Sequence, residues 1–237
     1  VNAMPVFADI QEETLNIDPF DIEKKITEKT KAIIPVHFGG YACDMDEILK
    51  VASEHDLYVI EDNAHGMGGE YKGKKLGTLG DLGCFSFHAV KNLATGDGGL
   101  IATNDDRIYE ELLKLRWLGI SQSTYKRSVR GYSWYYEVDC LGFKCHMNDI
   151  MASIGLVQLK KLDKANARRR AIVKRYNEEF EKMDWIGIPV EREYVKSSLH
   201  NYVIKVNQGD RNKLIAHLAE KGISAGVHYM PLYLHPI

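Results

Sequence analysis

The sequence predicts an α/β fold in which helices flank a mainly parallel central sheet, followed by a smaller C-terminal α+β domain. Between residues 30 and 118, apolar stretches of strand length alternate with amphipathic helical stretches, which is typical of right-handed βαβ units. The run 30–37, TKAIIPVH, is almost continuously apolar, as expected of a parallel strand covered on both faces. We therefore expect a large domain at 1–147, and a linking helix with a small domain at 148–237.

In the large domain we expect strands at 4–10, 30–37, 57–60, 83–87 and 99–103, and helices at 21–26, 46–55 and 105–118. The dipeptide 18–19, Asp-Pro, would open the first helix, and the helix 46–55 carries its apolar residues on one face. Residues 66–80 are rich in glycine and are expected to form a loop. The polar, tyrosine-rich stretch 121–137 is expected to be a functional loop.

From residue 148 a helical pattern runs to about residue 183, with Asn148 or Asp149 as its N-cap. The basic run 160–175 within it is interpreted as a solvated helix face. After this helix we expect a strand at 200–206, a helix at 210–221 ended by Gly222, and a strand at 223–229.

Composition excludes several classes of protein. The formal net charge of -2 gives no electrostatic reason to expect binding to nucleic acid or to an anionic membrane. No apolar run approaches the roughly 20 residues of a membrane span, and no secretion signal is visible. The 4 cysteines lack CxxC spacing, so we expect reduced thiols and a cytoplasmic location.

Both ends of the sequence are abrupt. The first residues, VNAMPVF, resemble the middle of an α/β domain, and the last, HPI, directly follow a motif. We therefore expect the chain to be truncated at both ends and to form part of a longer protein.

Two residues at predicted strand ends suggest the chemistry. Asp62 ends the strand around 57–60, and Lys91 follows the strand 83–87. Ligands of open parallel sheets bind outside the carboxyl ends of the strands, so these side chains could converge. A lysine can form a Schiff base with an aldehyde cofactor, and an aspartate can keep the ring nitrogen of that cofactor protonated.

Ser86 and His65 are further candidates at the same strand ends. The Ser86 hydroxyl could bind a cofactor phosphate, and His65 could form a hydrogen bond with the phenolic oxygen of the cofactor. The alternatives are an ordinary strand serine and a satisfied core histidine. For Asp62 the alternative is a helix N-cap.

Other motifs are rejected. The glycines at 66–69 fail the GxGxxG pattern because Tyr71 stands at its last position, and no GKS or GKT follows the turn 95–99. Cys140, Cys145 and His146 fit no standard zinc spacing, so no metal is expected.

The motifs 61–65 (EDNAH) and 85–92 (FSFHAVKN), with supporting stretches at 5–9, 34–37, 98–99, 141–144 and 228–232, resemble the DegT/DnrJ/StrS family of nucleotide-sugar aminotransferases. These enzymes use pyridoxal 5'-phosphate and have the type I (aspartate aminotransferase) fold of PLP-dependent transferases. The resemblance runs along almost the whole chain, in the same order. It does not include the family's N-terminal Gly-Thr phosphate loop or ring-stacking aromatic residue, which are absent from this sequence.

The resemblance implies roles for individual residues. Lys91 would carry the cofactor and move a proton between cofactor and substrate, Asp62 would bind the pyridine nitrogen, His65 would contact the ring oxygen, and Ser86 would bind the phosphate.

The resemblance also implies a homodimer with shared active sites. An asparagine of the partner subunit reaches the phosphate in many family members, and this sequence has Lys144 at that position. A lysine could serve the phosphate as a point charge. His228 and Tyr229 resemble a motif on the substrate side.

The implied activity is transfer of an amino group, with glutamate as donor, to a keto group on a nucleotide-linked deoxysugar. One alternative is a sugar dehydratase of the same fold, although such enzymes in the family carry histidine in place of the cofactor lysine. Another is a regulatory relative that binds sugar or cofactor without turnover. A nucleic-acid module resting on Arg168, Arg169 and Arg170 is the most distant alternative.

Overall fold

The computed structural model describes residues 2–121 and 134–236, and its contacts divide the chain into two compact units. Unit 1 contains Val1–Val173 and Val190–Tyr202, and unit 2 contains Lys174–Pro189 and Val203–Ile237. The long helix α5, Asp149–Phe180, contributes to both units. Most of the expected tyrosine-rich loop, 122–133, lies outside the described residues.

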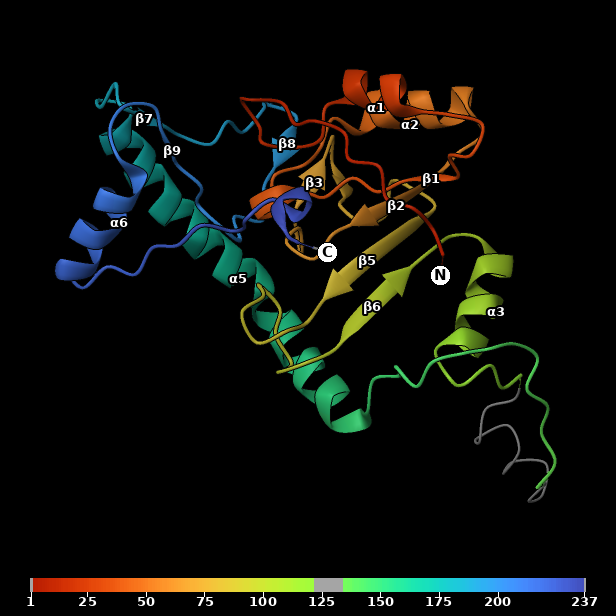
Figure 1. The fold of residues 1–237 in the computed structure, drawn as a ribbon. Helices are drawn as coiled ribbons and strands as arrows, with labels where there is room; N and C mark the ends of the chain where they lie inside the picture. The colour runs from red at the N-terminus through yellow and green to blue at the C-terminus, as the bar shows by residue number, and fades with distance from the viewer. Residues whose placement is uncertain (1, 122–133, 237) are drawn as a thin grey trace. The chain divides into compact units, whose positions relative to one another are not determined.

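The central sheet of unit 1 has the strand order β1-β2-β5-β6. These strands are Ala32–Ile33, Tyr58–Asp62, Leu82–Ser86 and Gly99–Ala102, and Figure 1 shows β2, β5 and β6 side by side. The predicted parallel pairing is confirmed for β1 with β2 and for β2 with β5. Strand β6 instead pairs antiparallel with β5. Residues 87–98 between them contain no helix, and parallel neighbours are usually joined by a helical crossover.

Helices α1, Pro19–Lys25, and α2, Met45–Glu54, lie together beside the first strands of this sheet (Figure 1). The Asp18 side chain accepts a hydrogen bond from the Phe20 backbone N–H and caps α1. Met45, Ile48 and Ala52 follow one another at helical spacing and are buried. They pack with residues of β1 and β2 in the main hydrophobic core, so the amphipathic pattern of 46–55 predicted both the helix and its buried face.

The expected loop at 66–80 contains a short hairpin. Strands β3, Glu70–Tyr71, and β4, Lys74–Lys75, pair antiparallel, and β8, Val195–Lys196, pairs with β3 on its other side. The two turn residues, Lys72 and Gly73, both have positive φ (48° and 79°), as a two-residue hairpin turn requires. The hairpin was missed because strands this short carry no readable alternation.

The other elements of unit 1 include α3, Asp106–Leu115, which is capped by Asp105 and ends near the expected place, and the short helix η1, Phe38–Gly40. The predicted strand at 4–10 is wrong. Of those residues only Ile10 makes a bridge, to Ile17. The described chain offers residues 4–9 no strand as a partner, and an extended segment needs such a partner for its backbone groups.

Unit 2 contains an antiparallel pair, β7 (Ile186–Gly187) with β9 (Lys205–Val206), the helix α6 (Arg211–Glu220) and the short helix η2 (Leu232–Leu234). Asp210 caps α6, as its place before an apolar run suggests. The expected strand at 200–206 is reduced to β9, and the expected strand at 223–229 is wrong, because those residues are exposed and form no ladder with a described strand.

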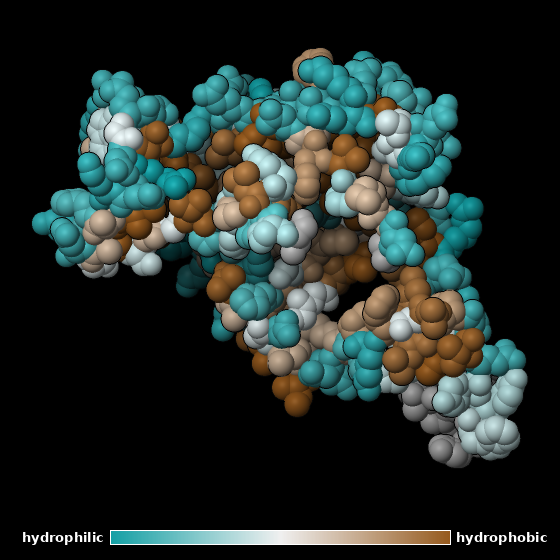
Figure 2. Space-filling model, in the orientation of Figure 1, coloured by the Kyte–Doolittle hydropathy of each residue, from teal (hydrophilic) through white to brown (hydrophobic). Residues whose placement is uncertain are grey.

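Apolar side chains are also present at the surface, where Figure 2 shows brown areas between the hydrophilic ones. Among the described residues, Leu141 is 96% exposed, Ile150 73% and Phe143 66%. Contiguous exposed apolar surface is typical of sites that contact further protein, whereas single exposed apolar residues are ordinary. None of the described helices is both long enough and apolar enough to cross a membrane.

We predict that Ile48→Ala lowers the free energy of unfolding by about 2–5 kcal/mol, because it leaves a cavity in the core beneath α2. Ile223→Ala, at a position 53% exposed, should change it by at most about 0.5 kcal/mol. Urea denaturation of both variants checks this. Equal losses in the two variants would contradict the described core.

Candidate active site

Lys91 and Asp62 come together at one edge of the central sheet. Asp62 is the last residue of β2 and lies opposite Cys84 of the neighbouring parallel strand β5. Lys91 lies in the turn that follows β5. Burial lowers the pKa of Lys91, and the nearby Asp62 carboxylate raises it without cancelling the effect of burial, so the pKa stays below its ordinary value of 10.5. The site therefore favours the free amine more than water does.

The turn that carries Lys91 is closed by backbone hydrogen bonds. The N–H of Lys91 donates to the carbonyl of His88 (2.9 Å), and the N–H of Thr95 donates to the carbonyl of Phe87 (2.9 Å). Phe87 is 8% exposed and Leu93 is 4% exposed, so apolar anchors stand on both sides of the lysine. The position of Lys91 is thus fixed by a packed turn.

Ser86 stands where β5 ends and this turn begins. Its hydroxyl accepts a hydrogen bond from the His88 N–H (3.3 Å), and its backbone lies opposite Gly99 of β6. The structure therefore places Ser86 at the same edge of the sheet as Asp62.

Asp62 is held by its backbone and by one carboxylate oxygen. Its N–H donates to the Pro35 carbonyl (2.9 Å), and its carbonyl accepts from the His37 N–H (3.2 Å). Its Oδ1 accepts from the Ala64 N–H (3.0 Å). The carboxylate thus has a fixed direction at the strand end.

His65 follows Asp62 and contacts a glycine turn. Its Nδ1 accepts a hydrogen bond from the Gly39 N–H (3.2 Å), so the proton of the neutral ring is on Nε2. Gly39 and Gly40 have φ of 63° and 93°. A Cβ on Gly40 would lie 2.2 Å from the Ser198 Oγ, so this close approach requires glycine.

Sequence reasoning missed the role of Glu61, which precedes Asp62 in β2. Its side chain is 0% exposed. Its Oε2 accepts hydrogen bonds from His37 Nε2 (2.8 Å) and the Gly77 N–H (2.8 Å), and its Oε1 accepts from the Leu79 N–H (2.6 Å) and the Gly80 N–H (2.8 Å). A buried carboxylate requires such partners.

The His37 partner is itself oriented. Its Nδ1 accepts a hydrogen bond from the Cys43 N–H (3.2 Å). In the neutral ring Nε2 therefore carries the proton and donates a hydrogen bond to Glu61. Burial raises the pKa of Glu61, but the hydrogen bonds from His37 and from the Gly80 and Gly77 N–H groups outweigh burial and hold that pKa below its ordinary value.

A second missed feature is a polar cluster beside Lys91. Asn92 binds the Asn166 side chain of α5, the Ser198 carbonyl and the His200 ring. The His200 ring lies 4.5 Å, centroid to centroid, from that of His65. A histidine or asparagine far along the chain gives no signal of such contacts in a single sequence.

Three further site residues were predicted from the sequence: Lys144, His228 and Tyr229. Lys144 is exposed, and its Nζ lies 5.1 Å from the centre of the Trp117 ring, with no described contact to Lys91. His228 and Tyr229 belong to unit 2 and are exposed. Among the described residues, no group of His, Cys, Asp and Glu is arranged to hold a metal ion.

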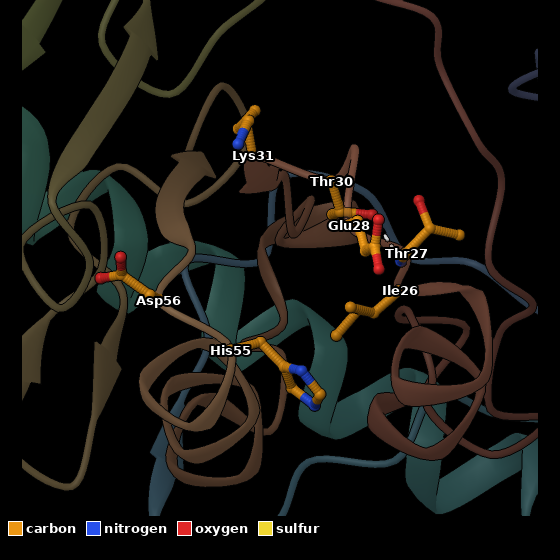
Figure 3. A pocket seen from close by; sticks show the side chains of 7 residues that line it. All are labelled: Ile26, Thr27, Glu28, Thr30, Lys31, His55 and Asp56. Carbon is orange, nitrogen blue, oxygen red and sulfur yellow. Dashed lines mark hydrogen bonds between the residues drawn. The ribbon is translucent and has the colours of Figure 1, made fainter.

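An open hollow of about 500 Å³ is lined by residues 26–28, Thr30, Lys31, His55 and Asp56 (Figure 3). These residues flank the beginnings of β1 and β2, so the hollow lies at the opposite edge of the sheet from Lys91. In Figure 3 the Asp56 side chain points away from the others. The hollow contains none of the candidate site residues.

The family model of the DegT/DnrJ/EryC1/StrS aminotransferases matches residues 1–237. The chain is 50% identical over 238 residues to the uncharacterized protein MJ1066 of Methanocaldococcus jannaschii, covering 99% of this chain and 62% of that protein. It is 42% identical to the spore coat polysaccharide biosynthesis protein SpsC of Bacillus subtilis, covering 99% of this chain and 61% of SpsC. The chain thus spans about three fifths of the length of these relatives.

Solved structures give the same result for the fold. The putative sugar aminotransferase Spr1654 of Streptococcus pneumoniae, in its PMP-form, matches with a TM-score of 0.91 and 36% identity, covering 99% of this chain and 64% of that one. PseC of Helicobacter pylori, an aminotransferase involved in the biosynthesis of pseudoaminic acid, matches with a TM-score of 0.89 and 32% identity, covering 98% and 61%. These matches confirm the predicted type I fold.

We predict that Glu61→Gln lowers the free energy of unfolding at pH 7 by about 3 kcal/mol, since an amide NH₂ would then face backbone N–H donors in a buried site. Because the folded-state pKa of Glu61 is depressed, its charge stabilises the fold above the ordinary pKa near 4.5, and this contribution is lost as pH falls. The difference from wild type should therefore shrink below about pH 4.5.

Chemical denaturation between pH 3.5 and 7 measures this difference. The matched control is Glu70→Gln, at a surface ion pair with Lys75, which should cost at most about 1 kcal/mol. A Glu61→Gln variant as stable as wild type at pH 7 would contradict the role assigned to the buried carboxylate.

Proposed function

Because the chain belongs to the DegT/DnrJ/EryC1/StrS aminotransferase family, we propose that it is part of a pyridoxal-phosphate-dependent sugar aminotransferase. In this proposal it transfers an amino group, with glutamate as donor, to a keto group on a nucleotide-linked deoxysugar. The observation that carries the proposal is the convergence of Lys91 and Asp62 at the carboxyl ends of paired strands. The structural matches to Spr1654, a putative sugar aminotransferase, and to PseC, an aminotransferase, support it.

The residues at this edge fit the chemical groups of pyridoxal phosphate. Lys91 offers an amine of lowered pKa for the aldehyde, and Asp62 offers a carboxylate for the ring nitrogen. His65, with the proton of its neutral ring on Nε2, can donate to the ring oxygen, and the Ser86 hydroxyl can serve the phosphate. When bound, the cofactor supplies an electron sink that stabilises negative charge on the substrate carbon.

Lys91 is proposed as the residue that moves the proton. The two half-reactions of a transamination require proton transfer in opposite directions, so the group must pass readily between amine and ammonium. Burial favours the amine, and the Asp62 carboxylate favours the ammonium. Burial is the larger of these two influences, so the pKa of Lys91 is lowered and the amine is favoured more than in water.

We predict that Lys91→Ala abolishes transamination and removes the site of covalent cofactor attachment. The measurement is reduction of the intact protein with borohydride in the presence of pyridoxal phosphate, followed by mapping of the pyridoxyl peptide by mass. Wild type should carry the adduct on Lys91. Lys74→Ala, at an exposed position on β4, is the control and should retain both adduct and turnover.

Three results would contradict this assignment: turnover retained in Lys91→Ala, an adduct on a different lysine, or no uptake of cofactor. An adduct on Lys91 without any half-reaction on addition of glutamate would favour the regulatory relative. Product formation that does not depend on an amino donor would favour the dehydratase.

The proposal includes a homodimer with shared sites, in which Lys144 serves the phosphate of the other subunit. It agrees with the position of Lys144, which lies on the Trp117 ring without a described contact to Lys91 in its own chain. Leu141 and Phe143, beside it in the sequence, are 96% and 66% exposed. His228 and Tyr229 remain proposed substrate contacts, and a cytoplasmic location stays a prediction from the sequence.

We predict that Leu141→Glu weakens self-association of the intact protein at least about tenfold, since a charge would be buried in the interface. Phe20→Glu, at a position 70% exposed on α1, is the control and should leave association unchanged. Sedimentation equilibrium measures both variants. A wild type that is monomeric at micromolar concentration would contradict the dimer.

A further inference from the structure

The polar cluster beside Lys91 has a defined hydrogen-bond direction. Asn92 Nδ2 donates to Asn166 Oδ1 (3.1 Å) and to the Ser198 carbonyl (2.8 Å). Both amide hydrogens are thereby used, so Asn92 Oδ1 must act as an acceptor. Its partner at 3.1 Å is His200 Nδ1, which therefore carries a proton and donates it.

The other side of His200 faces His65. The two ring centroids are 4.5 Å apart with an interplanar angle of 34°, within the range of ring stacking. On its own side, the His65 ring accepts from the Gly39 N–H. The His200 ring thus lies between the residue next to Lys91 and the residue that would contact the ring oxygen of the cofactor.

The segment that carries His200 is fixed on both sides. The N–H groups of Ser198 and Asn201 donate to the carbonyls of Gly40 (3.0 Å) and Gly39 (3.1 Å). The Ser198 hydroxyl donates to the His65 carbonyl (2.6 Å). The whole arrangement lies within unit 1. The backbone of His200 is therefore held in a fixed position relative to its two contacts, Asn92 and His65.

We propose that His200 is a positioning residue that couples the orientation of the His65 ring to the turn carrying Lys91. The inference rests on the proposed function, because it assigns His65 and Lys91 to the same cofactor. His200 acts through two separable contacts, a hydrogen bond to Asn92 and a ring contact to His65. Substitutions that keep one contact and remove the other therefore test it.

His200→Phe keeps a ring against His65 but removes the donor to Asn92, whereas His200→Gln keeps a donor but removes the ring. In cofactor-free protein, His200→Phe should speed hydrogen exchange of the backbone in residues 88–97, and His200→Gln should leave that exchange near wild type. Asn92→Ser, whose shorter side chain cannot reach His200 Nδ1, should speed hydrogen exchange in residues 88–97 as His200→Phe does.

Cofactor binding supplies the second readout. Both His200 variants should raise the Kd for pyridoxal phosphate by about tenfold, the order expected from one lost hydrogen bond or ring contact. Thermal unfolding of each variant shows whether the fold is retained. His55→Gln, at an exposed histidine beside the open hollow, is the control and should match wild type in both readouts.

Unchanged exchange in residues 88–97 of His200→Phe, or exchange that rises equally throughout the protein, would overturn the coupling. So would wild-type cofactor affinity in both His200 variants. Failure of the proposed function is distinguishable from these outcomes, because wild type would then bind no pyridoxal phosphate at Lys91, while hydrogen exchange of the cofactor-free protein would still report on the coupling.

Discussion

The described site depends on a single buried carboxylate. Glu61 has no exposed side-chain surface. The free-energy cost of burying an isolated charge there would exceed the net stability of a folded domain. Four donors compensate for this burial, one from His37 and three from the backbone of residues 77–80. Since the next residue in β2 is Asp62, these contacts also determine the position of this candidate cofactor-binding residue.

The same carboxylate explains why glycine is needed nearby. Gly77 has a φ of +82°, and a Cβ there would lie 2.4 Å from the Phe85 ring of β5. The loop can therefore bring its N–H groups to Glu61 only where the chain has no side chain. A glycine-rich composition predicted a loop at this place, but it gave no indication that the loop binds a charge.

The sequence predicted those features that depend on neighbouring residues. The apolar periodicity of 46–55 predicted α2. The strand ends before Asp62 and Lys91 predicted that the two side chains would lie near enough to interact electrostatically. Prediction from the sequence failed where a segment's contact partners are distant along the chain. Residues 4–10 have the composition of a strand but lack a described partner strand. Strand β6 runs antiparallel to β5, and not parallel as predicted, because the connection between them contains no helix. His200 contacts Asn92 across 108 positions, a distance over which one sequence carries no signal.

Strand alternation gives Glu61 and Asp62 different functions although they are adjacent. Side chains along a strand point alternately to its two faces, and the burial of β2 alternates accordingly, with Val59 and Glu61 buried and Ile60 and Asp62 only partly so. One face thus receives a carboxylate whose charge is stabilised by four hydrogen-bond donors, and the other presents a carboxylate that still acts on Lys91. Had the register slipped by one residue, the side chains of Glu61 and Asp62 would each point to the opposite face of the sheet. The hydrogen bonds of Glu61 therefore specify the register that makes Asp62 available for chemistry.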